Sequence, residues 1–147
     1  MLNYVSPESQ ARAEKIATEL ETLHSTRTIV VKADQATVDG PARLVEEATK
    51  AFGDRIDIII NNAGTCVCLS LEDSTAKQFD SHYYLNVRGP MLLVQAAIPY
   101  LPHDGSGRIV NISSISSSIG FPMQSPSAHS LNIQRYFLLV ARALTHL

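Results

Sequence analysis

The sequence has few cysteines, no tryptophan, no long apolar run and little excess charge of either sign. Its two cysteines, Cys66 and Cys68, are separated by one residue, which is too close for an ordinary framework disulfide. The amino-terminal residues lack the basic and apolar regions of a signal peptide. The most apolar stretch, Met91 to Ile98, is far shorter than a bilayer span. We therefore expect a cytoplasmic protein with no membrane contact.

The charge balance argues against nucleic-acid binding. Twelve lysines and arginines against fourteen acidic residues give a formal charge of −2, so no basic stripe is available to neutralise phosphates. Hydrophobic residues make up 45% of the chain, which is enough for a buried core and excludes disorder along the whole length. The 147 residues correspond to a single domain.

Apolar strand-like runs alternate with amphipathic helical segments along the chain. This alternation predicts the α/β class, with a parallel sheet covered by helices on both faces. The expected strands are residues 2–5, 28–31, 56–60 and 108–112, and the expected helices are residues 7–23, 41–52, 75–101 and 133–144.

Local signals mark several of the expected boundaries. Ser6 followed by Pro7 is typical of a helix N-cap and first helical residue, and Gly53 is a typical helix end. The pair Gly89-Pro90 predicts an interruption in the long third helix. Residues 113–130 are rich in serine and are expected to form a loop.

Polar or small residues follow three of the expected strands. Asp34 follows the second strand, residues 61–64 follow the third, and residues 111–114 follow the fourth. Ligands of open α/β sheets bind beyond the carboxyl ends of the strands, so these residues are candidates for one site, although each alone could simply form a turn. Gly64 has no Cβ and tolerates positive φ, which would let a ligand approach the backbone closely.

Three segments in order resemble the short-chain dehydrogenase/reductase family. They are Ile-Ile-Ile-Asn-Asn-Ala-Gly at 58–64, Asn-Val-Arg-Gly at 86–89, and Gly-Arg-Ile-Val-Asn-Ile-Ser-Ser at 107–114. The resemblance implies a Rossmann-type doubly wound parallel sheet, with residues 1–147 forming a partial dinucleotide-binding domain. It also implies hydride transfer between a nicotinamide dinucleotide and a small-molecule alcohol or carbonyl.

The resemblance assigns roles to individual residues of this chain. Asp34 would accept a hydrogen bond from the adenine amino group, and main-chain groups of Asn61 and Gly64 would line the adenosine ribose. Asn86 would hold a water of the proton relay. Ser114 would hydrogen-bond the substrate oxygen and stabilise the charge that develops on it.

Cofactor preference is predicted from the end of the first expected strand. NAD-preferring sheets usually carry an acid there to bind the ribose 2′-hydroxyl, whereas this chain has Tyr4 and Ser6 and no carboxylate before Glu8. An uncharged, hydroxyl-bearing strand end resembles relatives that prefer NADP(H). The sequence therefore favours NADP(H), with NAD not excluded.

Two motifs of the family are absent. The glycine-rich turn that would cradle a pyrophosphate, and the strand before it, do not occur, and the resemblance leaves the carboxyl-terminal strands missing as well. In the family's strand order this opens a gap between the strands at 2–5 and 56–60, so either they pair directly or the chain does not fold alone. The Tyr-x-x-x-Lys pair is replaced by Ser127 and Leu131, so we expect negligible turnover.

Two further interpretations remain open beside an active oxidoreductase. The chain could be a catalytically inactive remnant that pairs with an intact relative or with itself, using the apolar helices Met91–Leu101 and Ile133–Leu144. A zinc site formed by Cys66, Cys68 and His82 is the weaker idea, because a lone Cys-x-Cys lacks a second ligand pair. We therefore predict no metal.

Overall fold

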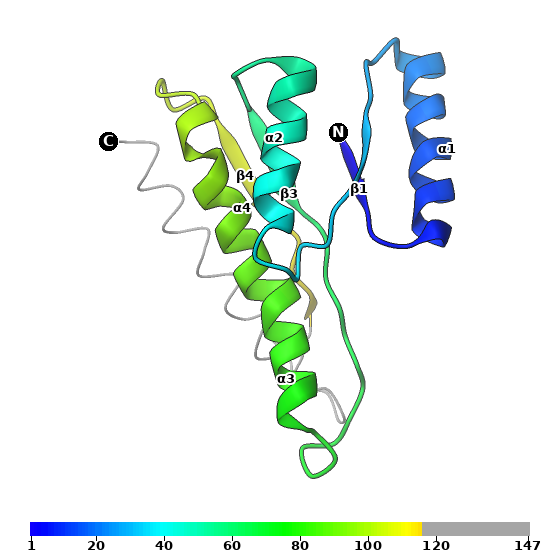
Figure 1. The fold of residues 1–147 in the computed structure, drawn as a ribbon, viewed down its shortest axis with the longest axis vertical. Coiled ribbons are helices and arrows are strands. Elements are labelled where there is room, and N and C mark those ends of the chain that lie inside the picture. The colour runs from blue at the N-terminus through cyan, green and yellow to red at the C-terminus, as the bar shows by residue number, and fades with distance from the viewer. Residues whose placement is uncertain (116–147) are drawn as a thin grey trace.

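A computed structural model describes residues 1–115 as an α/β arrangement (Figure 1). The elements in chain order are β1 (Leu2–Tyr4), α1 (Pro7–His24), β2 (Val30–Lys32), α2 (Gly40–Phe52), β3 (Ile58–Asn61), α3 (Ala76–Tyr83), a π-helical turn (Tyr84–Arg88), α4 (Gly89–Ala97), a 3₁₀ turn (Ile98–Tyr100) and β4 (Arg108–Asn111). The expected helix at 133–144, residues 127 and 131, and the serine-rich loop beyond residue 115 lie outside the described residues.

The predicted start of α1 and end of α2 are confirmed. The Ser6 side chain accepts a hydrogen bond from the Ser9 backbone N–H at 3.2 Å, and the Ser9 hydroxyl accepts one from the Ser6 backbone N–H at 2.9 Å. The two hydrogen bonds form a capping box. Gly53 ends α2 with φ +93°, a conformation that an L side chain rarely adopts. Within residues 1–115, no helix has the length and apolar character needed to cross a membrane.

The interruption expected at Gly89-Pro90 lies one turn earlier. Residues 84–88 form a wider π turn in which the Gly89 N–H reaches back to the Tyr84 carbonyl, and α4 then begins with Gly89 and Pro90. Proline lacks an N–H, and its ring crowds the carbonyl four residues earlier, so it fits the first turn of a new helix. The prediction located the break from the proline itself, whereas the backbone adjusts upstream of it.

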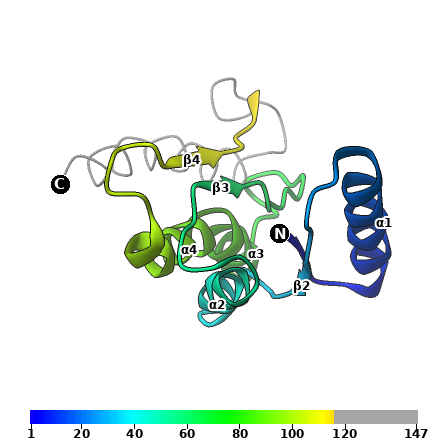
Figure 2. The same cartoon turned by 90° about the horizontal axis from the view of Figure 1, so that it is seen from above.

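The strands form two separate parallel pairs. β1 pairs with β2 and β3 pairs with β4, and Figure 2 shows β1 lying between β2 and β3. The direct pairing of β1 with β3 that the sequence analysis considered is therefore absent. Helices α2 and α4 pack together beneath both pairs and hold them in one body.

The core explains how the two pairs stay together. One cluster of buried residues joins β2, α2, β3 and α4: Val31, Ala33, Leu44, Val45, Ile59, Leu93 and Ala97. On the opposite face of β3, Ile58 and Ile60 are 61% and 59% exposed. The helix expected at 133–144 lies outside the described residues, so the expectation of helices on both faces stays a prediction for β3.

Strand boundaries also differ by one or two residues from those expected. The run Ile56–Ile60 predicted a strand, but β3 is Ile58–Asn61, because its register is set by pairing of Ile58 with Arg108 and of Asn61 with Asn111. β2 is likewise shifted to Val30–Lys32 by pairing with Leu2–Tyr4. A β-branched run indicates a strand without specifying which residues meet a partner.

Candidate functional site

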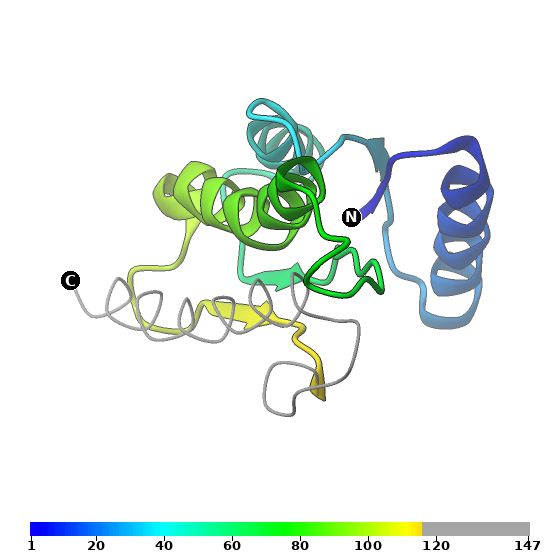
Figure 3. The ribbon, with the colours of Figure 1, turned by 90° about the horizontal axis from the view of Figure 1, so that it is seen from below.

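The carboxyl ends of the strands bring the predicted site residues to one edge of the molecule. Asp34 follows β2, residues 61–64 end β3 and begin the next loop, and Ser114 follows β4. Tyr4 and Ser6 lie at the end of β1. Figure 3 views the molecule from this edge, where the loop after β3 lies between the two strand pairs.

Asp34 is held in a compact turn. Its carbonyl accepts hydrogen bonds from the Thr37 N–H at 3.1 Å and from the Thr37 hydroxyl at 2.8 Å, and its Oδ1 accepts from the Ala36 N–H at 2.9 Å. An ionised carboxylate has about four acceptor positions, so the exposed Asp34 side chain keeps capacity for a ligand donor.

Two glycines let other elements approach this turn. A Cβ built on Gly40 would come 1.9 Å from the Asp34 carbonyl oxygen, and one on Gly89 would come 2.5 Å from the Gln35 carbonyl oxygen. The start of α2 and the start of α4 therefore both touch the backbone of the Asp34 turn. Any larger side chain at either position would displace it.

Asn86 is completely buried in the π turn and fixes the loop after β3. Its Oδ1 accepts from the Thr65 N–H at 2.9 Å and its Nδ2 donates to the Thr65 carbonyl at 3.0 Å. π turns occur frequently at functional sites, where they redirect a side chain. Here the side chain that the family resemblance assigned to a water contact is used to clamp a backbone.

His82 provides a second attachment for the same loop. It is 1% exposed, its Nε2 accepts from the Val67 N–H at 2.9 Å, and its Nδ1 lies 2.7 Å from the Gln78 carbonyl, so the proton belongs on Nδ1. Cys66 and Cys68 are exposed on this loop. In the part of the chain that the structure describes, no three His, Cys, Asp or Glu side chains are grouped so as to hold a metal.

Arg88 connects the π turn to the Asp34 turn. Its guanidinium lies 4.0 Å from the centre of the Tyr84 ring and donates to the Ala36 carbonyl. Neither the Arg88 contacts nor the His82 contact follows from the sequence analysis, which considered His82 only for the weak zinc site. The one available signal was their position in a helix that runs beside the strand ends.

Three further predicted residues, Asn61, Ser6 and Ser114, differ in burial and in hydrogen bonding. Asn61 is 2% exposed, and its Nδ2 donates to Asn111 Oδ1 at 2.7 Å, while its carbonyl accepts from the Ile112 N–H. The Ser6 hydroxyl is used in the α1 cap, and Ser114 is half-buried directly after β4.

Gly64 does not use the positive φ that glycine tolerates. Its φ is outside the positive range, and a Cβ there would meet Asn86 Oδ1 at an ordinary 3.5 Å. Gly64 is exposed, so the close approach of a ligand to its backbone stays a prediction.

Two carboxylates at this edge ionise more easily than usual. The Thr37 hydroxyl holds the pKa of Asp39 below its ordinary value, and the Ser6 hydroxyl does the same for the pKa of Glu8. Both groups are exposed, so the effect on stability is small. The consequence is a negative charge at the start of α2 and of α1, where it favours the helix dipole.

Comparison with known proteins agrees with this geometry. The chain is 40% identical over 139 residues to an L-xylulose reductase of Aspergillus niger and 34% identical over 146 residues to an L-xylo-3-hexulose reductase of Hypocrea jecorina. These matches cover 85% and 88% of this chain but 47% and 48% of the relatives, so the chain spans about half their length.

A solved structure gives the same result for the fold. A blue fluorescent protein from a metagenomic library, in complex with NADPH, superimposes with a TM-score of 0.87 at 31% identity, covering 97% of this chain and 57% of that one. The sequence profile of the short chain dehydrogenases matches residues 2–130. The fold is thus the Rossmann type expected from the sequence, and the chain belongs to the short-chain dehydrogenase family.

Proposed function

We propose that the protein is an NADP(H)-dependent oxidoreductase that interconverts a hydroxyl and a carbonyl group of a small molecule. The observation that supports this proposal is the position of Asp34, Gly64 and Ser114 after the carboxyl ends of parallel strands, with two of these loops held by Asn86 and Arg88. When bound, the nicotinamide would supply or accept the hydride.

The described residues fit one end of such a cofactor better than its middle. The exposed Asp34 carboxylate can accept from an adenine amino group, and the exposed backbone of Gly64 can meet a ribose. The N-terminus of α1 is already satisfied by the Ser6 and Ser9 hydroxyls, so it is not available to a phosphate. Because the sequence also lacks the glycine-rich turn, we expect weak but saturable binding.

The phosphate-bearing form of the cofactor is favoured by charge. Tyr4 at the end of β1 is paired in register with Lys32, which is exposed, so the ammonium could reach a phosphate bound there. A 2′-phosphate there would gain an ionic contact, and no carboxylate precedes Glu8 to repel it. The NADPH complex of the structural relative supports the same choice.

Binding of NADPH and NADH to the 147-residue chain tests the cofactor proposal. We expect Lys32→Gln to weaken NADPH binding about tenfold and to leave NADH binding unchanged, since one ionic hydrogen bond is lost. Lys15→Gln, on the exposed face of α1, is the matched control and should change neither. Absence of saturation by both nucleotides with the folded chain would reject the proposal.

Ser114 is proposed to donate to the substrate oxygen, and the class of substrate is proposed from the relatives. Both curated relatives are named for ketose reduction, so a panel of ketoses and polyols that includes L-xylulose is the appropriate screen. In an active form that carries the glycine-rich turn and the Tyr-x-x-x-Lys pair, Ser114→Ala should lower the rate of NADPH consumption about 100-fold or more. The affinity for NADPH should stay constant.

The absent Tyr-x-x-x-Lys pair favours a second candidate, a catalytically inactive chain that pairs with an intact relative. For this candidate, the segment Met91–Leu101 is a proposed contact, because Met91 of α4 and Ile98 of the 3₁₀ turn are 40% and 41% exposed while α4 packs on α2. Co-purification with an intact relative, lost in Met91→Glu, would support it. Ketose turnover by the 147 residues alone would reject it.

A further inference from the structure

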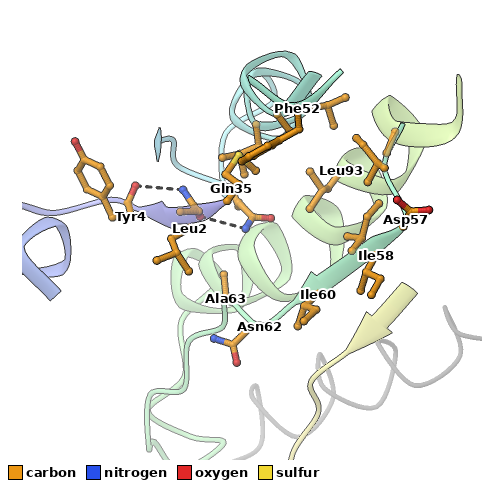
Figure 4. A pocket seen from close by; sticks show the side chains of 18 of the residues that line it. Leu2, Tyr4, Gln35, Phe52, Asp57, Ile58, Ile60, Asn62, Ala63 and Leu93 are labelled. Carbon is orange, nitrogen blue, oxygen red and sulfur yellow. Dashed lines mark hydrogen bonds between the residues drawn. The ribbon is translucent and has the colours of Figure 1, made fainter. Parts of the chain in front are cut away.

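The loop after β3 begins beside a cleft and then leaves it. The cleft lies between β1 and β3, has a volume of about 1160 Å³ and a mostly apolar lining, and has α2 and α4 contributing to its floor. Figure 4 shows Leu2 of β1 and Ile60 of β3 in its walls, with Asn62 and Ala63 at the start of the loop. The described residues 64–75 do not line the cleft, so the rest of the loop lies outside it.

Two thiols, those of Cys66 and Cys68, lie in this outer part of the loop. Both residues are exposed, and the structure shows them as thiols rather than as a disulfide. A single residue, Val67, separates them, and the chain has no other cysteine. Exposed thiols are accessible to small oxidants such as hydrogen peroxide. The loop therefore carries both sulfur atoms that a reversible oxidation within one chain requires.

Buried side chains hold the backbone around these thiols. Asn86 accepts from the Thr65 N–H at 2.9 Å and donates to the Thr65 carbonyl at 3.0 Å. The Nε2 of His82 accepts from the Val67 N–H at 2.9 Å. Cys66 thus lies between two residues whose backbone positions are fixed.

Chain connectivity brings the two cysteines close to the distance of a disulfide. Residues 62–68 lie in no helix or turn, and two residues of extended chain span about 6.6–7.2 Å between Cα atoms. A disulfide needs Cα atoms about 4.4–6.8 Å apart, most often about 5.5–6 Å. Closure of a ring between Cys66 and Cys68 therefore requires a bend at Val67 that shortens this span.

His82 cannot follow such a bend. Its side chain is 1% exposed, and its Nδ1 lies 2.7 Å from the Gln78 carbonyl, one turn earlier in α3. A bend at Val67 rotates the peptide group between Cys66 and Val67, so the N–H of that group leaves the Nε2 of His82. A buried acceptor that loses its donor destabilises the state in which the donor is lost. The His82 contact therefore favours the dithiol over the disulfide.

We propose that Cys66 and Cys68 are a redox modification site, at which hydrogen peroxide forms an intramolecular disulfide and so releases the Val67 N–H from His82. The proposal is independent of whether the carboxyl edge binds a nucleotide. Release would detach the loop beyond Cys66, while Asn86 still holds Thr65.

The chemistry of this step balances. One thiolate attacks the peroxide, the O–O bond breaks and hydroxide leaves, which gives a sulfenic acid. The second thiolate attacks that sulfur, the S–O bond breaks and hydroxide leaves again, which gives the disulfide. The two sulfurs give up two electrons, and the peroxide becomes two molecules of water with the two thiol protons. A dithiol reductant reverses the reaction by thiol–disulfide exchange.

Mass spectrometry of the peroxide-treated full chain tests formation of the disulfide. We expect loss of two hydrogen atoms in the peptide that contains both cysteines, without linked dimers on a non-reducing gel, and recovery with dithiothreitol. Cys66→Ser and Cys68→Ser are matched controls, and neither should lose two hydrogens. Oxygen addition at the separate cysteines, linked dimers, or no change in the unmodified chain would each overturn the proposal.

Hydrogen exchange in the two redox states tests release of the loop. The Val67 amide should exchange about tenfold or more faster in the disulfide than in the dithiol, because its acceptor is lost. The Thr65 amide is the internal control and should keep its protection. Peroxide-treated Cys68→Ser should also keep the protection of Val67. Equal Val67 exchange in both states, or equal loss at Thr65 and Val67, would overturn the link to His82.

The dithiol–disulfide equilibrium in dithiothreitol buffers measures the same link from the other side. His82→Leu removes the contact that favours the dithiol, so the equilibrium should shift about tenfold toward the disulfide, or about 30 mV for a two-electron couple. His103→Leu, at an exposed residue, should leave it unchanged. An unchanged equilibrium in folded His82→Leu would reject the link. If that variant does not fold, Val67 exchange in the unmodified chain decides.

Discussion

Two regions differ in how fully their backbone groups are hydrogen-bonded: the edge formed by the carboxyl ends of the strands, and the cleft between β1 and β3. At the edge, side chains from the helices hold the backbone of each loop: Asn86 holds Thr65, and His82 holds Val67. In the cleft, the peptide groups of Asn3 and Ile58 face an open apolar space. The chain thus fixes its candidate site with its own side chains, whereas the described strands are not joined between β1 and β3.

The largest expected effect on stability comes from removing the Asn86 side chain, which holds the loop after β3 through Thr65. Asn86→Ala leaves both backbone groups of Thr65 without their partner, so we expect a loss of about 2–4 kcal/mol in unfolding free energy. Denaturant unfolding measures this loss. Asn62→Ala, at an exposed neighbour in the same loop, should change stability by less than about 0.5 kcal/mol. Similar losses in both variants would contradict the clamp.

Two glycines near the carboxyl ends of the strands, Gly40 and Gly64, should respond differently to substitution by alanine. Gly40→Ala should cost about 1–3 kcal/mol and displace the Asp34 turn, because the added Cβ would collide with the Asp34 carbonyl. Gly64→Ala has room for its Cβ and should leave thermal stability nearly unchanged. A fall in NADPH affinity in Gly64→Ala would then report a cofactor contact, whereas unchanged affinity would remove Gly64 from the proposed binding residues.

The His82 contact can be observed at a single amide. His82→Leu removes the acceptor of the Val67 N–H, so hydrogen exchange of that amide should become faster by about tenfold or more. His103→Leu, at an exposed residue, is the control and should leave Val67 exchange unchanged. Equal protection of Val67 in His82→Leu and in the unmodified chain would show that other contacts hold the loop.

The smallest expected effect is on pH dependence. Because the Thr37 hydroxyl lowers the pKa of Asp39 in the folded state, its contribution to stability is present above the carboxyl's ordinary pKa and is lost as the pH falls through the folded value. Asp39→Asn should therefore reduce stability slightly at neutral pH and converge with the unmodified chain below about pH 3. A constant difference across this range, measured by thermal unfolding, would contradict the hydrogen bond.

Sequence reasoning succeeded where a local signal determines the structure. The Ser6 cap, the end of α2 at Gly53 and the order of strands and helices all follow from residues within one turn of the feature. The same reasoning found the strand ends that form the carboxyl edge, because a parallel sheet brings them together.

Features that depend on distant neighbours were not found from the sequence. The close approach of Gly40 and Gly89 to residues 34–35 exists only after α2 and α4 pack beneath the strands. The partner of His82 is fifteen residues earlier, in a loop without any periodic pattern. Side-chain contacts of this kind are selected by tertiary packing, and local propensity carries no information about them.

The helical floor beneath the cleft has a consequence for how the molecule unfolds. Since the core cluster joins β2, α2, β3 and α4, the two strand pairs cannot separate without disrupting the packing of α2 on α4. The two pairs should therefore unfold together in one cooperative step, although no backbone ladder joins them within residues 1–115.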